Sequence, residues 1–592
     1  MASSAATIAQ MFDRQAKRYG DRALLKAKAG KQWRDYSWRE IADSADQLRA
    51  GLIGIGLRAG DRLAILADNG PKWIVVDQAA LGMGAVVVPL YTTNGPEEMQ
   101  HILSDSGAVV AAIEGPHNLE RIAAIKDRLP HLRTLVRMDQ DGAGADGSTA
   151  QTTSIAQLGA GQKAEVCEGR GQDLATLIYT SGTTGPAKGV MLTHRNILAN
   201  AEASMAHIEL GEGDMTLSFL PIAHAFERTV HYTVFMAGGT VAYAEGLTQI
   251  AQNLLEVNPT ILLTVPRLLE VIHGRILRTI ESSSALRQRI FRFALSTGTR
   301  AAWYRHRGRP LPPHLAAAMA PLRRLVFSRI RAPFGKRIRY LISGGAPLPV
   351  EVFELLAAAE VPIVEGYGLT EASPVVSCNF HGRTRLGTVG PPLKNVTVKT
   401  ASDGELLIHA ESVMAGYFNR EAETREAIDS EGWLHTGDVA EIDSDGFIKI
   451  KDRKKEIIVL SGGKNVSPAN LETRLVADPY IAQACVFGDR RKHLAALLVP
   501  DFATLRDQAR TKGLPADAAP ELLVGDPQVR AFYQRKIREF NKALSDVEAI
   551  AAFTLIASSF SQENGELTPT MKVRRRVIAI HYERQIEAMY RN

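Results

Sequence analysis

Short apolar runs alternate with helix-like segments along the first part of the chain. Residues 61–66 follow a glycine-containing turn and residues 85–89 read AVVVP, so both are predicted to be buried strands. Between them, residues 71–83 fit a helix that has a proline near its first turn. This alternation predicts β-α-β units and a mostly parallel sheet.

The pattern changes in the last third of the chain. Residues 404–408 and a hairpin turn at residues 443–446 predict short strands. The charged run at residues 451–455 is predicted to be a strand-free join, after which the pattern restarts as a compact α+β stretch. We therefore predict an α/β protein with a large N-terminal domain of layered, mostly parallel sheets and helices, residues 1–451, and a small C-terminal α+β domain, residues 452–592.

The composition is that of an ordinary globular protein. Of 592 residues, 45% are hydrophobic and 23% are charged, which excludes a disordered tail, a collagen-like rod and a small disulfide scaffold. No apolar run reaches the ~18 residues that cross a bilayer. The amino terminus has no positive charge before Arg14 and no long apolar core, so no secretory signal is expected. An odd number of cysteines without a CxxC pair favours a reducing cytoplasm over a zinc or disulfide framework: Cys167, Cys378 and Cys485.

The positive charge is concentrated in one segment. The net charge is only +6, yet residues 275–339 contain sixteen Lys or Arg and one acid, Glu281, which leaves −9 for the rest of the chain. Apolar residues at helical spacing predict amphipathic helices interrupted at residues 308–310. We favour a peripheral contact with an anionic membrane, at the inner face of the membrane. Solvated helix faces are the main alternative, and nucleic acid is not expected because no known motif accompanies the charge.

A glycine- and hydroxyl-rich loop is the strongest chemical signal. Residues 179–190 read YTSGTTGPAKGV, with three glycines, four Ser or Thr side chains and Lys188. Converging backbone N–H groups, hydroxyls and one lysine suit a polyphosphate. A flexible linker is the alternative, but a linker needs neither the apolar strand before the loop nor the capped helix start LTHRN after it. Ala187 precedes Lys188, so this is not the GxxxxGK[ST] nucleotide loop.

YTSGTTGPAKG resembles the signature loop of the adenylate-forming (AMP-binding) superfamily. Further stretches resemble that family's motifs in the correct order: LPIAHAFER from residue 220, ISGGAPL (342–348), EGYGLTE (365–371), HTGD (435–438), DRKKEIIVLSGGKNVSP (452–468) and LTPTMKVRRR (567–576). Their wording is most similar to the long-chain fatty acid–CoA ligase branch. The resemblance implies an adenylate-forming enzyme fold with a mobile C-terminal domain. It also implies ATP-dependent activation of a long-chain fatty acid and its transfer to coenzyme A, with Mg²⁺ as cofactor and acyl-CoA, AMP and pyrophosphate as products.

The resemblance also implies a nucleotide site. Tyr367 is expected to stack on adenine, and Glu371 is expected to hold Mg²⁺ together with Thr180. Asp438 is expected to accept the ribose hydroxyls, with Arg453 as a further donor. The expected ATP- or AMP-binding residues are Thr180, Ser181, Gly182, Thr183, Thr184, Gly185, Lys188, Gly345, Ala346, Glu365, Gly366, Tyr367, Gly368, Thr370, Asp438, Arg453 and Lys572.

Catalytic, acyl and coenzyme A residues follow from the same resemblance. Lys572 is expected to bridge the fatty carboxylate and the α-phosphate, which offsets the repulsion between two anions. The expected catalytic residues are Lys572, Thr180, Lys188 and Glu371. His224 and Phe226 are expected to border the acyl pocket. The hinge and the coenzyme A channel are assigned to Lys455, Ser461, Gly462, Gly463 and Lys464.

Three other functions stay open at this point. The enzyme could load the acyl group onto an acyl-carrier protein instead of coenzyme A, or it could act on medium-chain or aryl carboxylates. A binding scaffold that has lost catalysis is disfavoured, because the residues that carry the chemistry are intact. Chain-length preference, metabolic pathway and oligomeric state, a homodimer included, are not determined by this sequence.

Overall fold

The computed structural model describes residues 5–139, 151–180, 186–380, 382–454, 456–462, 464–506, 518–568 and 572–591. Several predicted site residues lie outside these ranges: Ser181, Gly182, Thr183, Thr184, Gly185, Lys455 and Gly463.

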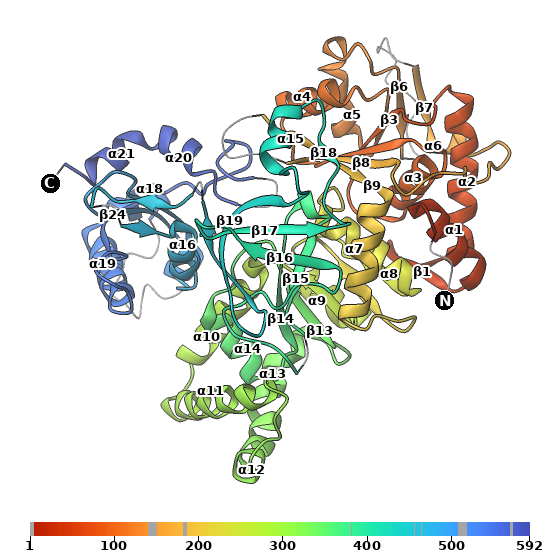
Figure 1. Ribbon diagram of the computed structural model, residues 1–592. Coiled ribbons are helices and arrows are strands. Elements are labelled where there is room, and N and C mark those ends of the chain that lie inside the picture. Colours follow the sequence, from red (N-terminus) through yellow and green to blue (C-terminus); the bar gives the residue numbers. More distant parts are fainter. Residues whose placement is uncertain are drawn as a thin grey trace.

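An eight-stranded sheet with the order β18-β9-β8-β4-β3-β5-β6-β7 forms one side of the N-terminal part (Figure 1). Its strands from β8 to β7 pair in parallel, whereas β9 pairs antiparallel with both β8 and β18. The predicted strand-helix-strand unit is confirmed as β3, α3 (Pro71–Gly82) and β4. The strand bounds are β3 Arg62–Leu66, β4 Val86–Leu90, β5 Val110–Ile113, β6 Thr134–Arg137, β7 Gln151–Ser154, β8 Leu174–Thr180, β9 Lys188–Thr193 and β18 Gly416–Tyr417.

A second eight-stranded sheet has the order β15-β14-β13-β12-β10-β11-β1-β2. The strands from β14 to β1 are parallel and only the two edges are antiparallel. Parallel strands place their carboxyl ends along one edge, where ligands bind in such sheets. The bounds are β1 Ala23–Ala29, β2 Gln32–Ser37, β10 Met215–Ser218, β11 Thr240–Tyr243, β12 Ile261–Thr264, β13 Tyr340–Ser343, β14 Ile363–Gly368 and β15 Val375–Cys378.

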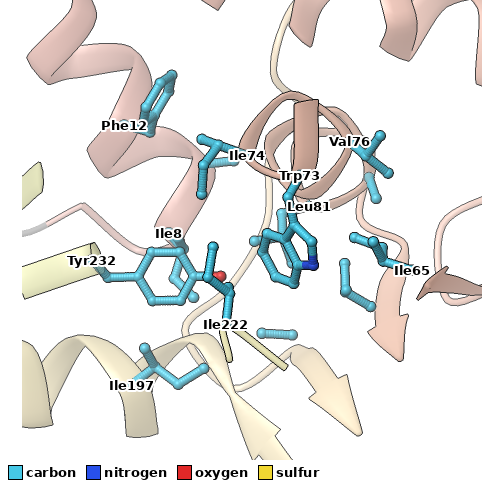
Figure 2. Packing of buried hydrophobic residues seen from close by; sticks show 14 of the residues in the cluster. Ile8, Phe12, Ile65, Trp73, Ile74, Val76, Leu81, Ile197, Ile222 and Tyr232 are labelled. Carbon is cyan, nitrogen blue, oxygen red and sulfur yellow. The ribbon is translucent and has the colours of Figure 1, made fainter. Parts of the chain in front are cut away.

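Helices that pack on the two sheets contribute side chains to one large hydrophobic cluster. Figure 2 shows Ile8, Trp73, Ile65, Ile197 and Tyr232, from five different elements, meeting in this cluster. The helices that contribute to it are amphipathic or fully buried, so their apolar faces account for the pairing of the two sheets. The helix bounds on this side are α1 Ile8–Tyr19, α2 Trp38–Gly54, α4 Pro96–Ser106, α5 Pro116–Ala123, α6 Ile155–Leu158, α7 His194–His207, α8 Ala225–Ala237 and α9 Ile250–Val257.

A charged network lies inside this apolar cluster. Arg228 on α8 donates to Asp77 on α3 at 2.5 Å and to Thr176 on β8 at 2.6 Å, and both charged residues are almost completely buried. The Tyr232 hydroxyl donates to the other Asp77 oxygen at 2.8 Å, and Trp73 offers its ring face to the guanidinium. Each charge is therefore paired and hydrogen-bonded, as a buried ion pair requires.

Beyond the second sheet, the chain forms a four-stranded antiparallel sheet, β16 (Val396–Thr400), β17 (Glu405–Ala410), β19 (Leu434–Ile442) and β20 (Ile448–Arg453). The predicted hairpin at residues 443–446 joins β19 to β20. However, the prediction that residues 451–455 are strand-free is wrong for residues 451–453, which end β20. Buried Ile448 and Asp452 alternate with exposed lysines along this strand, so the charges occupy its solvent face.

The C-terminal part has its own core around a three-stranded sheet, β23 (Ile481–Phe487), β24 (Leu494–Pro500) and β25 (Ile550–Leu555). Helices α16 and α19 pack on it, and a two-stranded hairpin precedes it (Figure 1). This is the predicted α+β character. The remaining bounds are β21 Ile458–Val459, β22 Asn465–Val466, α15 Glu421–Ala427, α16 Pro468–Val476, α18 Pro520–Gly525, α19 Pro527–Asn541, α20 Arg575–His581 and α21 Glu583–Ala588.

The basic segment forms a helical excursion between β12 and β13, which are paired neighbours in the sheet. As predicted, it is interrupted near residues 308–310, between α11 and α12. In Figure 1, α11 and α12 stand away from the sheets. None of the described helices is both long enough and apolar enough to cross a bilayer. The bounds are α10 Pro266–Glu281, α11 Ala285–Arg305, α12 Pro313–Leu322, a π-helical turn at Arg323–Phe327, α13 Ser328–Arg331 and, after β13, α14 Val350–Ala358.

Replacing Asp77 with Ala is expected to lower the free energy of unfolding by about 3–5 kcal/mol, because Arg228 is left buried without its counter-ion. Chemical denaturation of the purified protein measures this change. Asp13→Ala is the matched control, since it breaks an exposed ion pair with Lys17 and should cost at most about 1 kcal/mol. Equal losses in the two variants would contradict a special role for the buried pair.

Candidate active site

The two ends of the glycine-rich loop lie next to each other. β8 ends at Thr180 and β9 begins at Lys188, and these two residues are register partners in the antiparallel pair. Both are partly exposed. The strands therefore place a hydroxyl and an ammonium group side by side where the loop leaves the two strands. A phosphate-binding loop requires this arrangement.

A second group of predicted residues gathers where β14 and the four-stranded sheet meet. The Tyr367 hydroxyl donates to Asp438 Oδ2, and Arg453 Nε donates to Asp438 Oδ1 at 3.1 Å. Burial, followed by the Asp438 charge, raises the pKa of Tyr367 well above its usual value, so the hydroxyl remains a donor. Asp438 and Arg453 are also register partners in the β19–β20 pair. Three predicted nucleotide-binding side chains thus form one connected group.

The loop after β13 contacts Glu365, another of the predicted residues. Gly345 and Ala346 are exposed there, and Gly345 has a φ of +83°, a conformation that favours glycine. The Leu348 amide donates to the buried Glu365 carboxylate at 3.4 Å. Desolvation raises the pKa of Glu365 to about 7. The structure therefore places Glu365 beneath this loop as a support.

Glu371 has a partner that the motif analysis missed. The Tyr417 hydroxyl donates to Glu371 Oε1 at 2.8 Å, and Lys188 Nζ lies 5.1 Å from the centre of the Tyr417 ring. Tyr417 thereby connects the phosphate loop to Glu371. The available signal was the Gly416-Tyr417 pair, in which Gly416 has a φ of +137°. Such a glycine marks a position where the backbone follows a path that other residues rarely adopt.

Lys572 reaches the same region from the C-terminal part. It is exposed to water, but desolvation and then the charge of Arg453 lower its pKa, while Asp438, Glu456 and Glu371 act in the opposite direction. The lysine thus lies within electrostatic range of Asp438, Glu456 and Glu371. Its backbone is fixed by hydrogen bonds in both directions with Thr568, of 2.8 and 3.0 Å.

His224 and Phe226 lie at the start of α8. His224 Nδ1 accepts a hydrogen bond from the Phe226 amide at 3.2 Å and so caps the helix. Desolvation, followed by the charge of Lys572, lowers the pKa of His224 to about 4, so the ring is neutral at physiological pH. Phe226 packs against an apolar cluster under the second sheet: Ile208, Ile261, Leu263, Tyr340, Ile342, Val364 and Cys378.

The sequence profile of the AMP-binding enzyme family matches residues 12–418, and that of the AMP-binding enzyme C-terminal domain matches residues 455–592. The chain belongs to this family. It is therefore an adenylate-forming ligase.

Named relatives support the same assignment. The long-chain-fatty-acid–CoA ligase FadD15 of Mycobacterium bovis is 36% identical over 567 residues, which cover 94% of this chain and 93% of the relative. Among solved structures, the adenylation domain of a carboxylate reductase from Mycobacterium chelonae is 24% identical, with a TM-score of 0.81 over 100% of this chain and 92% of that domain. O-succinylbenzoate coenzyme A synthetase of Bacillus subtilis, solved with ATP and magnesium ion, is 22% identical, with a TM-score of 0.67 over 96% and 98% of the two chains.

The side chains present in this AMP-binding enzyme fit a nucleotide-bound Mg²⁺. Glu371 uses Oε1 for Tyr417, and within the described ranges Oε2 accepts no hydrogen bond. Mg²⁺ commonly takes one or two carboxylates together with phosphate oxygens and water. The described residues contain no group of three or more His, Cys, Asp or Glu side chains that could hold a metal ion by themselves.

The predicted coenzyme A segment lies elsewhere on the C-terminal part of the enzyme. Ser461 and Gly462 are exposed in the turn between β21 and β22. The Ser461 amide donates to the Arg491 carbonyl at 2.8 Å, and the Leu460 amide donates to the Lys464 carbonyl at 2.9 Å. In the described part of the chain, these hydrogen bonds remain within the C-terminal region. Lys572 thus interacts with predicted nucleotide-binding residues, whereas Ser461, Gly462 and Lys464 form no hydrogen bond or ion pair with them among the described residues.

Proposed function

We propose that this adenylate-forming ligase activates a long-chain fatty acid with ATP and transfers the acyl group to coenzyme A. The observation that carries the proposal is that Lys188 and Glu371 share Tyr417 as a neighbour, while Lys572 interacts electrostatically with Glu371, Asp438 and His224. The long-chain substrate is supported by the 36% identical relative named as a long-chain-fatty-acid–CoA ligase.

In the first step, a carboxylate oxygen of the fatty acid attacks the α-phosphorus of ATP. A bond forms between them while the bond to pyrophosphate breaks, which leaves acyl-adenylate. Lys572 stabilises the approach of the two anions, and Lys188 binds the departing phosphates. Mg²⁺, held by Glu371 and Thr180, would neutralise phosphate charge. Asp438 and Arg453 fix the ribose, so the α-phosphorus is held at the carboxylate.

In the second step, the thiolate of coenzyme A attacks the acyl carbonyl and AMP leaves. We assign the thiol channel to the segment 461–464. In this structure Lys572 interacts with Asp438 and Glu371, whereas the hydrogen bonds of Ser461 and Lys464 stay within the C-terminal part. The proposal therefore includes rotation of residues 452–592 about a join at Lys455, between the steps.

Lys572→Ala is expected to slow acyl-adenylate formation about a hundredfold, the usual effect of removing one group that stabilises charge in the transition state. The second step, started from supplied acyl-adenylate and coenzyme A, should keep its rate. Pyrophosphate release and thioester formation, measured separately, test the two steps. Equal losses in both would contradict the assignment of Lys572 to the first step alone.

Fatty acids from C4 to C20 should produce AMP in a coenzyme A-dependent reaction, with the highest kcat/KM at the long end. Mass spectrometry of the products identifies acyl-CoA. AMP formation that peaks at short or aryl acids would support the medium-chain or aryl alternative. Acyl-adenylate that accumulates with coenzyme A and is consumed only with an acyl-carrier protein would support the carrier-protein alternative.

We further propose that α11 contacts an anionic membrane surface. The helix contains five arginines and no acid. Its amino-terminal half exposes Leu286 by 68%, Ile290 by 41% and Phe293 by 60%. These three residues follow the i, i+4, i+7 spacing of one helix face. Apolar side chains among exposed cations are the combination that anionic bilayers bind.

The contacts of the other arginines in the basic segment support the choice of this helix. Glu360 forms ion pairs with Arg305, Arg323 and Arg331, so these charges are partly neutralised. Arg339 is paired with Asp214 in the same way. Of the apolar positions predicted to share a helix face, Ile272, Ile276 and Ile280 pack against the core instead. In α11, the exposed apolar face therefore occurs together with arginines that form no ion pair within the described ranges, Arg287, Arg289 and Arg292.

Charge reversal of Arg287, Arg289 and Arg292 to Glu is expected to weaken binding to anionic vesicles by about a hundredfold, since each cation near such a surface contributes ~1 kcal/mol. Co-sedimentation at low and high salt measures the binding. Reversal of three exposed arginines on α19 is the matched control and should have little effect: Arg530, Arg535 and Arg538. Equal binding of the wild type to neutral and anionic vesicles, or to neither, would contradict the proposal.

A further inference from the structure

Tyr417 is held beside the phosphate loop by backbone hydrogen bonds. It belongs to β18, which pairs antiparallel with β9 and places Tyr417 opposite Val190. The next amide, that of Phe418, donates to the Gly189 carbonyl at 2.8 Å. The backbone at position 417 is therefore fixed relative to the strand that begins at Lys188, whichever side chain occupies that position.

The same short segment also fixes Glu371. The Met414 amide donates to the Glu371 carbonyl at 2.8 Å, and the Tyr417 hydroxyl donates to the Glu371 carboxylate, also at 2.8 Å. Glu371 is thus held through both its backbone and its side chain. Because the hydroxyl donates to Oε1 alone, it orients the carboxylate and leaves Oε2 available to a ligand.

The ring of Tyr417 lies between two opposite charges. Its face receives the Lys188 ammonium at 5.1 Å, within the range of a cation–π contact, while its hydroxyl binds Glu371. Within the described ranges, Lys188 forms no ion pair. Without an intervening ring, a flexible lysine and a half-buried carboxylate at this spacing would attract each other directly. Such a pair would occupy the groups that are needed for phosphate and for metal.

We propose that Tyr417 is a positioning residue for Mg·ATP, which orients Glu371 through its hydroxyl, holds Lys188 on its ring face and keeps the two from pairing. The inference rests on the nucleotide site proposed above. The two contributions are separable. The hydroxyl orients Glu371, and the ring holds Lys188 away from Glu371. Phenylalanine retains the ring alone, and leucine retains neither.

The test measures binding of a non-hydrolysable ATP analogue by calorimetry over a series of Mg²⁺ concentrations. Tyr417→Phe should raise the Mg²⁺ concentration for half-saturation about tenfold, because Glu371 loses a hydrogen bond to a charged group. At saturating Mg²⁺ this variant should bind the analogue like the wild type. Tyr417→Leu should in addition lower the affinity for the analogue itself about tenfold, since Lys188 is released to pair with Glu371.

Tyr19 provides a matched control far along the chain from these residues. Its hydroxyl donates to Glu212 at 3.0 Å, and Arg18 and Arg22 each lie 5.0 Å from its ring, so it makes the same two kinds of contact. Tyr19→Phe should leave the Mg²⁺ dependence unchanged. Thermal unfolding of every variant without ligand separates positioning from stability.

An unchanged Mg²⁺ dependence in Tyr417→Phe, or equal losses in the phenylalanine and leucine variants, would overturn the positioning role. The positioning role would also be overturned if a lowered unfolding temperature alone accounted for the loss of Mg²⁺ or analogue binding. A wild-type protein that binds no analogue would overturn the nucleotide site itself, which distinguishes failure of the proposed function from failure of this inference.

Discussion

The buried pair of Asp77 and Arg228 ties together the parts that build the active site. Arg228 lies on α8 just after His224 and Phe226, and its second hydrogen bond reaches Thr176 on β8, the strand that leads to the phosphate loop. The pair therefore fixes the start of α8 relative to that strand. A charged pair at the centre of an apolar cluster tolerates little displacement, because separation would leave each ion unpaired in a medium of low dielectric.

Around the proposed nucleotide site, the fold uses one arrangement twice. A tyrosine hydroxyl donates to a carboxylate while a cation lies nearby, first with Tyr417, Glu371 and Lys188, and again with Tyr367, Asp438 and Arg453. In both cases the hydroxyl satisfies only one carboxylate oxygen. The second oxygens differ, because Asp438 Oδ1 accepts from Arg453 whereas Glu371 Oε2 accepts no hydrogen bond within the described ranges. A ligand at Glu371 therefore has no internal ion pair to break first, while a ligand at Asp438 has to compete with Arg453.

Local patterns in the sequence were sufficient for many elements of the fold. The apolar runs and the proline between them predicted β3, α3 and β4, and turn residues predicted the hairpin between β19 and β20. The charged run misled at the end of β20, where exposed lysines alternate with the more buried Ile448, Ile450 and Asp452. Composition reports how polar a segment is, whereas the alternation of its residues determines which face they occupy.

The contacts that join distant segments could not be predicted in this way. Asp77 and Arg228 are 151 positions apart, and Tyr417 and Glu371 are 46 apart, so neither pair leaves a periodic signal. Motif resemblance indicated Tyr367, Asp438 and Arg453 as a set, but not the hydrogen bonds that connect them. It also gave no indication that Glu360 collects three of the arginines in the basic segment. These features depend on how the sheets pack.

The helical excursion of residues 265–339 joins two paired neighbours of one sheet. It leaves the carboxyl end of β12 at Thr264 and returns at the amino end of β13 at Tyr340, which pairs with Ile261. Buried residues of the excursion share a hydrophobic cluster with both strands, so its inner face is tied to the sheet. Its exposed helix positions carry no such constraint, and in evolutionary terms selection can reshape the outer surface of this enzyme there without altering the strand register.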